Sequence, residues 1–137
     1  MENKALQALM IKEIDDMVAY YEVNPDARRA KYGDECAYLV EETGAKCAIG
    51  RMLNEDDFKM LKKDHMLFDT TIFDIYEILT TERIKALPLS FLAQLQEVHD
   101  NDTFWNAEGL TNIGKTAINT IKIDVDNGMY SLPLTNH

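Results

Sequence analysis

Apolar residues recur every three or four positions along residues 5–21, and charged residues occupy the positions between them. This spacing predicts an amphipathic helix, because residues three and four apart lie on the same helix face. Pro25 disfavours the helical conformation in the residue before it, so we expect this N-terminal helix within residues 1–23. Its apolar stripe consists of Leu6, Leu9, Met10, Ile14, Met17, Val18 and Tyr21.

Two short apolar segments, residues 36–40 and 45–49, flank the sequence Glu41-Glu42-Thr43-Gly44. A polar connection of this length between two apolar segments is typical of a β-hairpin, and its glycine suits a positive φ angle. We therefore predict one β-hairpin over residues 36–49.

Helical patterns dominate the rest of the chain. Asn54 precedes three acidic residues, which is typical of a helix N-cap followed by an acidic first turn. Residues 70–79 are apolar on nearly all sides and predict a buried helix, with a strand as the alternative because several of them are β-branched. Residues 90–99 and 109–121 predict two more amphipathic helices, and residues 124–137 are expected to form a tail.

Length and composition place these elements in one fold class. A chain of 137 residues fits a single domain, and its 46% of hydrophobic residues exclude wholesale disorder. We predict an α+β domain, mostly α, with about five helices packed around one β-hairpin. The N-terminus lacks the pattern of a secretory signal and no apolar stretch approaches the ~20 residues of a membrane span, so we expect a cytoplasmic protein.

The charge balance narrows the set of partners. The chain has 24 acidic and 14 basic residues, and its formal net charge is −10. Such a charge opposes contact with a phosphate backbone, so we expect no direct binding of nucleic acid. The acidic residues gather in the first half of the chain, which would suit a protein that imitates the phosphate array of DNA, although most charge runs are simply solvated faces.

The two cysteines, Cys36 and Cys47, lie on the two arms of the predicted hairpin. A hairpin can bring two thiolates to one edge, where His99 and His65 are the candidates to complete a zinc site. The spacing of these residues matches none of the common zinc motifs. One competing interpretation is that both cysteines are buried thiols. Another is a disulfide, which a reducing compartment disfavours. We therefore expect no cofactor, with zinc as the alternative.

No motif predicts a catalytic residue. A cysteine-based enzyme stays an alternative, because Cys47 or Cys36 could be paired with His99 and an Asp, and the nearby Arg51 could lower the pKa of the Cys47 thiol. Trp105 follows Phe104 at a turn and is a candidate anchor for a protein partner, since aromatic residues dominate interface hot spots. Arg51 is the second candidate for partner binding. A core position is the competing interpretation for Trp105.

Four short motifs resemble a known family. They are Cys36-Ala37-Tyr38, Gly44-Ala45-Lys46-Cys47-Ala48-Ile49-Gly50-Arg51, Leu95-Gln96 with His99-Asp100, and Trp105-Asn106 with Gly109-Leu110. In this order they resemble a family of small uncharacterised proteins of bacteria and their phages. The family has no established activity, so the resemblance implies a setting in the bacterial cytoplasm and no catalytic residue. We predict a non-enzymatic accessory protein that binds a protein partner, such as a phage-encoded inhibitor or modulator of a host defence or nucleic-acid-processing factor.

Overall fold

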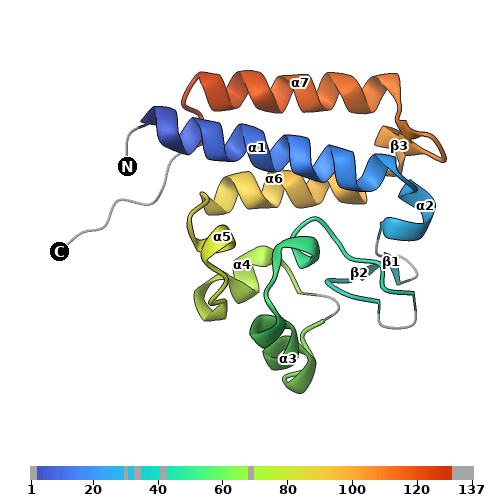
Figure 1. Ribbon diagram of the computed structural model, residues 1–137, viewed down its shortest axis with the longest axis vertical. Helices are drawn as coiled ribbons and strands as arrows, with labels where there is room; N and C mark the ends of the chain where they lie inside the picture. Colours follow the sequence, from blue (N-terminus) through green and yellow to red (C-terminus); the bar gives the residue numbers. More distant parts are fainter. Residues whose placement is uncertain (1–2, 30, 33–34, 41–42, 68–69, 131–137) are drawn as a thin grey trace.

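The computed structural model describes residues 3–29, 31–32, 35–40, 43–67 and 70–130 (Figure 1). This part of the chain contains seven α-helices, three short 3-10 turns and two antiparallel sheets of two strands each. The fold belongs to the α+β class and is mostly helical, as the sequence predicts. Within the described residues, no helix combines the length and apolar character needed to cross a membrane.

Three long helices form the upper layer of the molecule in Figure 1. They are α1 (Asn3–Glu22), α6 (Leu89–Asp100) and α7 (Asn112–Asp126). Helix α7 runs antiparallel to α1 and packs beside it, and α6 contacts α7 from below (Figure 1). This three-helix layer holds the N-terminal helix that the sequence predicts.

The apolar stripe of α1 explains its place in the layer. Met10, Ile14, Met17 and Tyr21 are all fully buried, and Leu6 is nearly so. Burying a large apolar side chain stabilises a fold by roughly 1.5–3 kcal/mol, so this stripe fixes the face that α1 turns inward. The predicted amphipathic helix is therefore confirmed.

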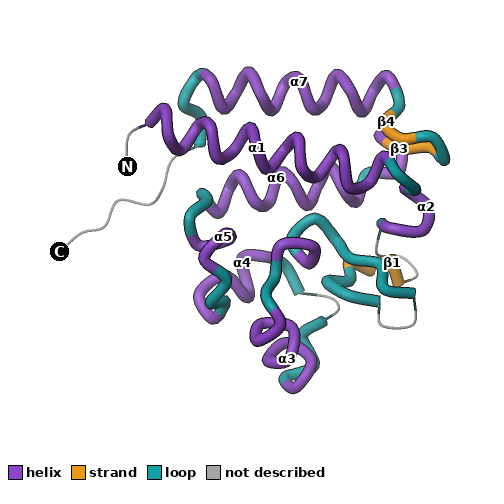
Figure 2. The backbone as a smooth tube through the Cα atoms, viewed as in Figure 1, coloured by secondary structure: helices purple, strands orange, loops and turns teal. Residues whose placement is uncertain are grey.

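Shorter segments make up the lower part of the molecule, which consists of the described residues between 29 and 85 (Figure 2). Its helical segments are η1 (Gly50–Met52), α3 (Glu55–Lys63), α4 (Ile72–Ile75), η2 (Tyr76–Ile78) and α5 (Glu82–Lys85). The helix α2 (Pro25–Arg28) connects α1 to this lower part, and η3 (Asp102–Phe104) follows α6.

Side-chain caps begin two of the short helices. The Asn54 side chain accepts a hydrogen bond from the backbone N–H of Asp57 at 2.8 Å, so the N-cap predicted for this helix is confirmed. Thr71 and Asp74 form a reciprocal capping box at the start of α4. Within the predicted helix over 70–79, residues 72–78 are helical, as α4 followed by a 3-10 turn. The expected burial on all sides is wrong, because Phe73 is 60% exposed and Ile78 is 44% exposed.

The β-hairpin predicted over residues 36–49 is largely absent from the described residues. Val40 and Ala45 form a single bridge around a turn in which Gly44 has a φ of +77°. Beyond that bridge, Lys46 pairs with Arg29 instead of with the opposite arm. Tertiary packing explains the difference, since the residues after Lys46 enter the core as a compact turn and not as an alternating strand.

The regular strand pairs lie elsewhere. Strand β1 (Lys31–Tyr32) pairs with β2 (Glu35–Cys36), so the first cysteine belongs to a hairpin that ends where the predicted one begins. Strand β3 (Trp105–Asn106) pairs with β4 (Gly109–Leu110) between α6 and α7 (Figure 2). Both are two-residue ladders joined by short connections.

The predicted tail begins later than residue 124. Helix α7 continues to Asp126, and its penultimate residue Val125 is fully buried. Burial of this apolar side chain supports one more helical turn than the apolar pattern up to Ile121 indicates. Residues 131–137 lie outside the described residues.

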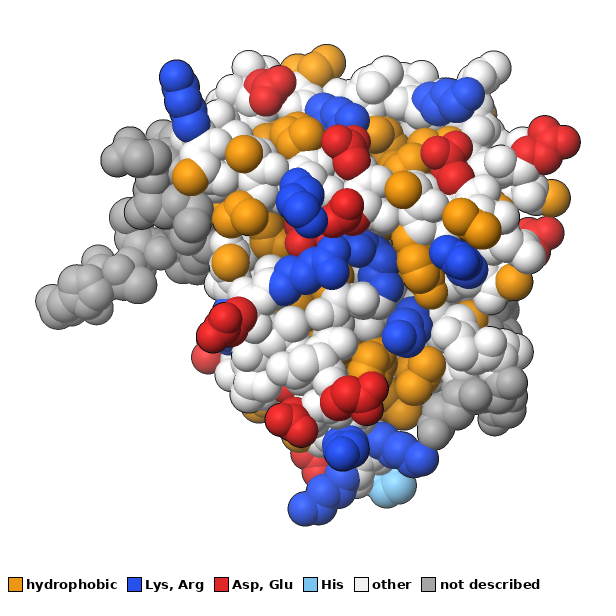
Figure 3. Space-filling view, viewed as in Figure 1, with side chains coloured by type: hydrophobic (Ala, Val, Ile, Leu, Met, Phe, Trp, Pro, Cys, Tyr) orange, Lys and Arg blue, Asp and Glu red, His pale blue; other side chains and the backbone are white. Residues whose placement is uncertain are grey.

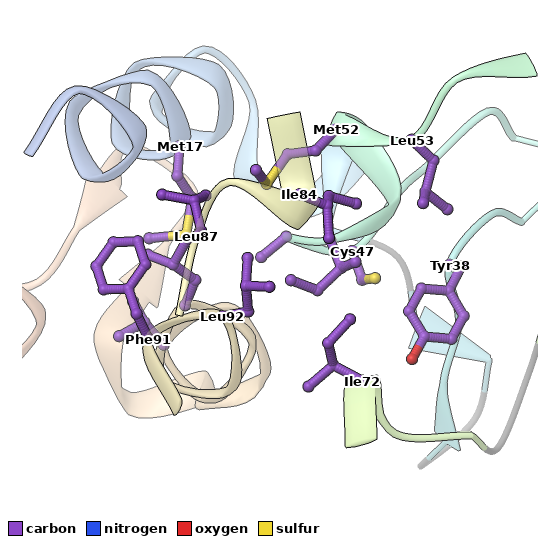
Figure 4. Close-up of a cluster of buried hydrophobic side chains, with 14 of the residues drawn as sticks. Met17, Tyr38, Cys47, Met52, Leu53, Ile72, Ile84, Leu87, Phe91 and Leu92 are labelled. Carbon is purple, nitrogen blue, oxygen red and sulfur yellow. The ribbon is translucent and has the colours of Figure 1, made fainter. Parts of the chain in front are cut away.

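One hydrophobic cluster joins the upper layer to the lower part (Figure 4). Met17 of α1 and Leu92 of α6 meet Ile84 of α5 and Met52 of η1 in this cluster. Gly50 permits the close packing, because a Cβ atom at this position would lie 1.9 Å from the backbone oxygen of Tyr38. The turn over residues 47–50 can therefore lie directly against the Tyr38 backbone.

Candidate functional site

A groove lies between α4 and α6 and encloses about 300 Å³. Its walls are mostly apolar, apart from a few polar groups of α6. The lining residues are Thr70, Thr71, Ile72, Phe73, Ala93, Gln96, Glu97 and Asp100. We call this feature the α4/α6 groove.

Phe73 is the exposed aromatic side chain at this groove. The capping box of Thr71 and Asp74 fixes the first turn of α4, with Thr71 N–H donating to Asp74 Oδ2 at 3.0 Å. In that turn Ile72 and Ile75 point into the core, where they are 3% and 0% exposed. The same geometry leaves Phe73 on the outer side, 60% exposed. An apolar ring of this size in water is available for contact with a partner.

The opposite wall of the α4/α6 groove is acidic. Asp100 accepts a hydrogen bond from Gln96 Nε2 at 2.9 Å, and it lies 2.7 Å from His99 Nδ1. The His99 side chain itself is fully buried and packs against the Tyr21 ring, with 5.1 Å between ring centroids. His99 and Gln96 thus hold the Asp100 carboxylate in place. Glu97, which follows Gln96 in α6, is exposed.

The predicted zinc ligands are only partly described. Cys47 is fully buried, and its Sγ accepts a hydrogen bond from the Gly50 N–H at 3.2 Å. The side chain of Cys36 lies outside the described residues. His65 is exposed just after α3, whereas His99 lies in the last turn of α6, and these two helices lie in different parts of the molecule (Figure 1). No group of three His, Cys, Asp or Glu side chains that could hold a metal occurs among the described residues.

The burial of Cys47 does not suit the alternative of a cysteine-based enzyme. A nucleophilic cysteine has to be reached by its substrate, and Cys47 is 0% exposed in the core (Figure 4). The Arg51 side chain extends toward α1, where its Nη2 donates to the Glu13 backbone oxygen at 3.3 Å. A catalytic role of Cys47 stays a prediction that the buried position does not support.

Trp105 occupies the core position that was the competing interpretation. Its side chain is 5% exposed, and its Nε1–H donates to the backbone oxygen of Val98 at 2.8 Å. The Tyr21 ring packs against it edge to face at 5.7 Å. Trp105 therefore stabilises the junction of α1, α6 and β3, and its role as a partner anchor stays untested.

A second hollow, which encloses about 460 Å³, lies between α1, α5 and the segment over residues 46–51. Lys46, Arg51 and Arg83 line it together with Asp16, Ala19 and Tyr20, and we call it the basic hollow. Lys and Arg side chains gather in the middle of the face shown in Figure 3, between α1 and the short helices below it. In a chain of net charge −10 this is an unusual concentration of cations.

Carboxylates of α1 hold two of these cations. Arg83 forms a bidentate pair with Glu13 through one edge of its guanidinium: Nε donates to Oε2 and Nη2 donates to Oε1, each at 2.6 Å. That hydrogen-bonded pair raises the pKa of Arg83. Arg51 Nη2 lies 3.8 Å from Glu13 Oε1, and burial lowers the pKa of Arg51.

The basic hollow could not be found from the sequence. Its cations come from three positions, and 37 residues separate the first from the last, Lys46 from Arg83. No spacing rule connects a turn residue to a residue in a four-residue helix. Arg51 is named above as a partner-binding candidate, and the structure places it in this hollow. Phe73 was missed because its neighbours predict a buried helix.

Comparison with known proteins gives no family for this domain. The chain matches none of the protein-family models, curated proteins or solved structures with which it was compared. The resemblance to the bacterial and phage family stays a prediction. The α4/α6 groove and the basic hollow are therefore the features of the structure that bear on function.

Proposed function

We propose that the protein acts by binding a partner protein, without chemistry of its own, and that the α4/α6 groove receives a short segment of that partner. The exposed Phe73 ring beside an apolar-walled groove carries this proposal. A groove of about 300 Å³ is at the small end of known ligand sites, which suits one large side chain and its neighbours.

The charge of the groove defines the partner segment. Glu97 and Asp100 line the wall opposite Phe73, and the whole chain carries a net charge of −10. Complementary charge speeds association and selects between partners. The segment we propose therefore has an aromatic or aliphatic side chain next to a Lys or Arg, so that the apolar group enters the groove and the cation meets the acidic wall.

The setting proposed for this binding follows from the resemblance described above. In that setting the protein is encoded by a bacterium or phage, lies in the cytoplasm of the bacterial cell, and inhibits or modulates a host factor. Its net charge of −10 disfavours nucleic acid as the direct target, so a protein is the proposed partner.

The test uses a display library of random 12-residue peptides selected on the immobilised protein. We expect enrichment of peptides that pair an apolar side chain with Lys or Arg, and an affinity loss of at least about tenfold on Phe73→Asp, as for a hot-spot residue. The matched control is Ile113→Asp on α7, because Ile113 is 62% exposed and does not line the groove.

The same selection can contradict the proposal. If the enriched peptides bind the Phe73→Asp and Ile113→Asp variants equally well, the α4/α6 groove is not the site. If no peptide is enriched above an unrelated acidic protein, recognition of a short segment is wrong. Enrichment of acidic peptides would overturn the charge argument.

A further inference from the structure

The basic hollow holds a donor that the fold itself does not satisfy. The Arg51 side chain is 5% exposed, and its Nε–H has no hydrogen-bond partner. This nitrogen is the one buried side-chain polar atom without a partner among the described residues. Buried donors are almost always paired, so an unpaired one in a residue that lines the hollow calls for an acceptor.

The carboxylates near the hollow are already engaged by other cations. Glu13 is held by Arg83 in the bidentate pair at 2.6 Å. Asp16 accepts a hydrogen bond from Lys12 at 2.7 Å, which lowers the pKa of Asp16. Neither carboxylate accepts a hydrogen bond from Arg51 Nε.

Two cations of the hollow make no hydrogen bond to a carboxylate of the described residues, although Arg51 forms a longer ion pair with Glu13. Lys46 Nζ lies 5.4 Å from the centroid of the Phe58 ring, a contact that leaves its three donors available. Arg51 is 3.8 Å from the nearest Glu13 carboxylate oxygen, beyond hydrogen-bond distance. Both side chains line the same hollow, and Tyr20 forms part of its wall.

We propose that the basic hollow binds the phosphate group of a small phosphomonoester. Such a group carries between one and two negative charges at neutral pH and three strong acceptor oxygens, which matches the two cations Lys46 and Arg51. The volume of about 460 Å³ leaves room for an organic part beside the phosphate. This site is separate from the α4/α6 groove and does not depend on the function proposed for it.

The direct test follows the Nε–H signal of Arg51 in ¹H–¹⁵N spectra of the labelled protein, with the signal assigned from the Arg51→Lys variant. The probes are inorganic phosphate and glycerol phosphate, with acetate as a simple carboxylate, all at ionic strength held constant with sodium chloride. We expect a saturable shift with both phosphates, and half-saturation by acetate at a concentration at least about tenfold higher, since acetate carries one charge.

Two pairs of variants, each matched in charge change, locate the site. Lys46→Gln should weaken phosphate binding about tenfold, as expected for loss of one charge-assisted hydrogen bond. Lys122→Gln is its control, because Lys122 pairs with Asp15 and does not line the hollow. Asp16→Asn should strengthen binding severalfold by removing a repelling carboxylate from the rim, whereas Asp15→Asn should leave it unchanged.

Three results would overturn the proposal. One is a shift of the Arg51 signal that grows linearly with phosphate, which would indicate an adventitious ion only. Another is an equal loss of affinity in Lys46→Gln and Lys122→Gln, which would show a general effect of net charge. The third is equally tight binding of acetate, which would make the site one for carboxylates.

Discussion

The three-helix layer and the lower part of the molecule are held together in different ways. Helices α1, α6 and α7 have 12 to 20 residues, and each presents a stripe of buried apolar side chains. In the lower part, the α-helices after α2 have four to nine residues. Segments this short bury little apolar surface on their own, so other contacts have to fix them.

Buried polar groups supply those contacts in the lower part. Asp57 is 1% exposed and accepts hydrogen bonds from the backbone N–H and hydroxyl groups of both Thr80 and Thr81. The Tyr38 hydroxyl donates to the Thr70 backbone oxygen at 2.9 Å. The long helices are thus stabilised by apolar stripes that can be seen in the sequence. The short helices are stabilised by individual polar contacts that the spacing of residues in the sequence does not show.

The largest loss of stability is expected from a substitution in the core of the three-helix layer. Phe91 of α6 is fully buried and packs against Tyr130 with 5.5 Å between ring centroids, so Phe91→Ala should lower the free energy of unfolding by about 3–5 kcal/mol. Urea denaturation measures this loss. Phe73→Ala is the control, since its exposed ring should cost under about 1 kcal/mol. Equal losses would contradict the view that apolar burial holds the layer.

A comparable effect is expected from one polar residue of the lower part. Asp57→Ala leaves four donors without their acceptor, and the two from Thr81 are buried, so it should lower the free energy of unfolding by about 3 kcal/mol. Asp56→Ala in the same helical turn is exposed and should cost less than about 1 kcal/mol. If the two variants unfold at the same urea concentration, Asp57 does not hold α3 to the segment before α5.

Acid should weaken the same contact. Burial alone would raise the pKa of Asp57, but the hydrogen bonds from Thr81 and Thr80 outweigh it and hold the pKa below the usual 3.8. A carboxyl group whose pKa is lower when folded stabilises the protein above the unfolded pKa, and this stability disappears as the pH falls through the folded pKa. Unfolding free energies measured from pH 6 down to pH 2.5 should therefore fall more steeply in the wild type than in Asp57→Asn. Parallel curves would be evidence against this.

The smallest effect concerns the tie between the two regions. Tyr21 of α1 donates its hydroxyl to the Lys46 backbone oxygen at 2.5 Å, and burial raises the pKa of Tyr21 well above 10. Tyr21→Phe should lower the free energy of unfolding by about 1 kcal/mol through the loss of this bond. The neighbouring Tyr20→Phe keeps the bond and should be close to neutral. If Tyr20→Phe lowered the melting temperature more than Tyr21→Phe, the Tyr21 hydroxyl would not be the group that joins the two regions.

This contrast explains what could be predicted from the sequence. The stripe of α1 and the N-cap at Asn54 follow from local spacing, so both were predictable. The hairpin over residues 36–49 was placed by the same kind of rule, but burial of the turn after Lys46 overrides the strand pattern. Local patterns succeed where one helix buries its own stripe, and they fail where tertiary contacts decide.

The candidate sites depend on such tertiary contacts. Arg51 could be named from the sequence but not joined to Lys46 and Arg83, because only the folded chain brings the three together. Asp57 looks like an ordinary first-turn acid, and its partners Thr80 and Thr81 are 23 and 24 residues away. No spacing rule reaches across that distance, so both clusters required the structure.

The packing of Gly50 against the Tyr38 backbone has an evolutionary consequence. Any side chain at position 50 would place its first carbon 1.9 Å from the Tyr38 oxygen, so the turn could not be kept in its present path. Descendants of a common ancestor that retain this fold should therefore share a glycine here even after most other positions have diverged. A glycine at position 50 together with an aromatic residue twelve positions earlier, here Tyr38, thus gives a reference point for aligning distant homologues.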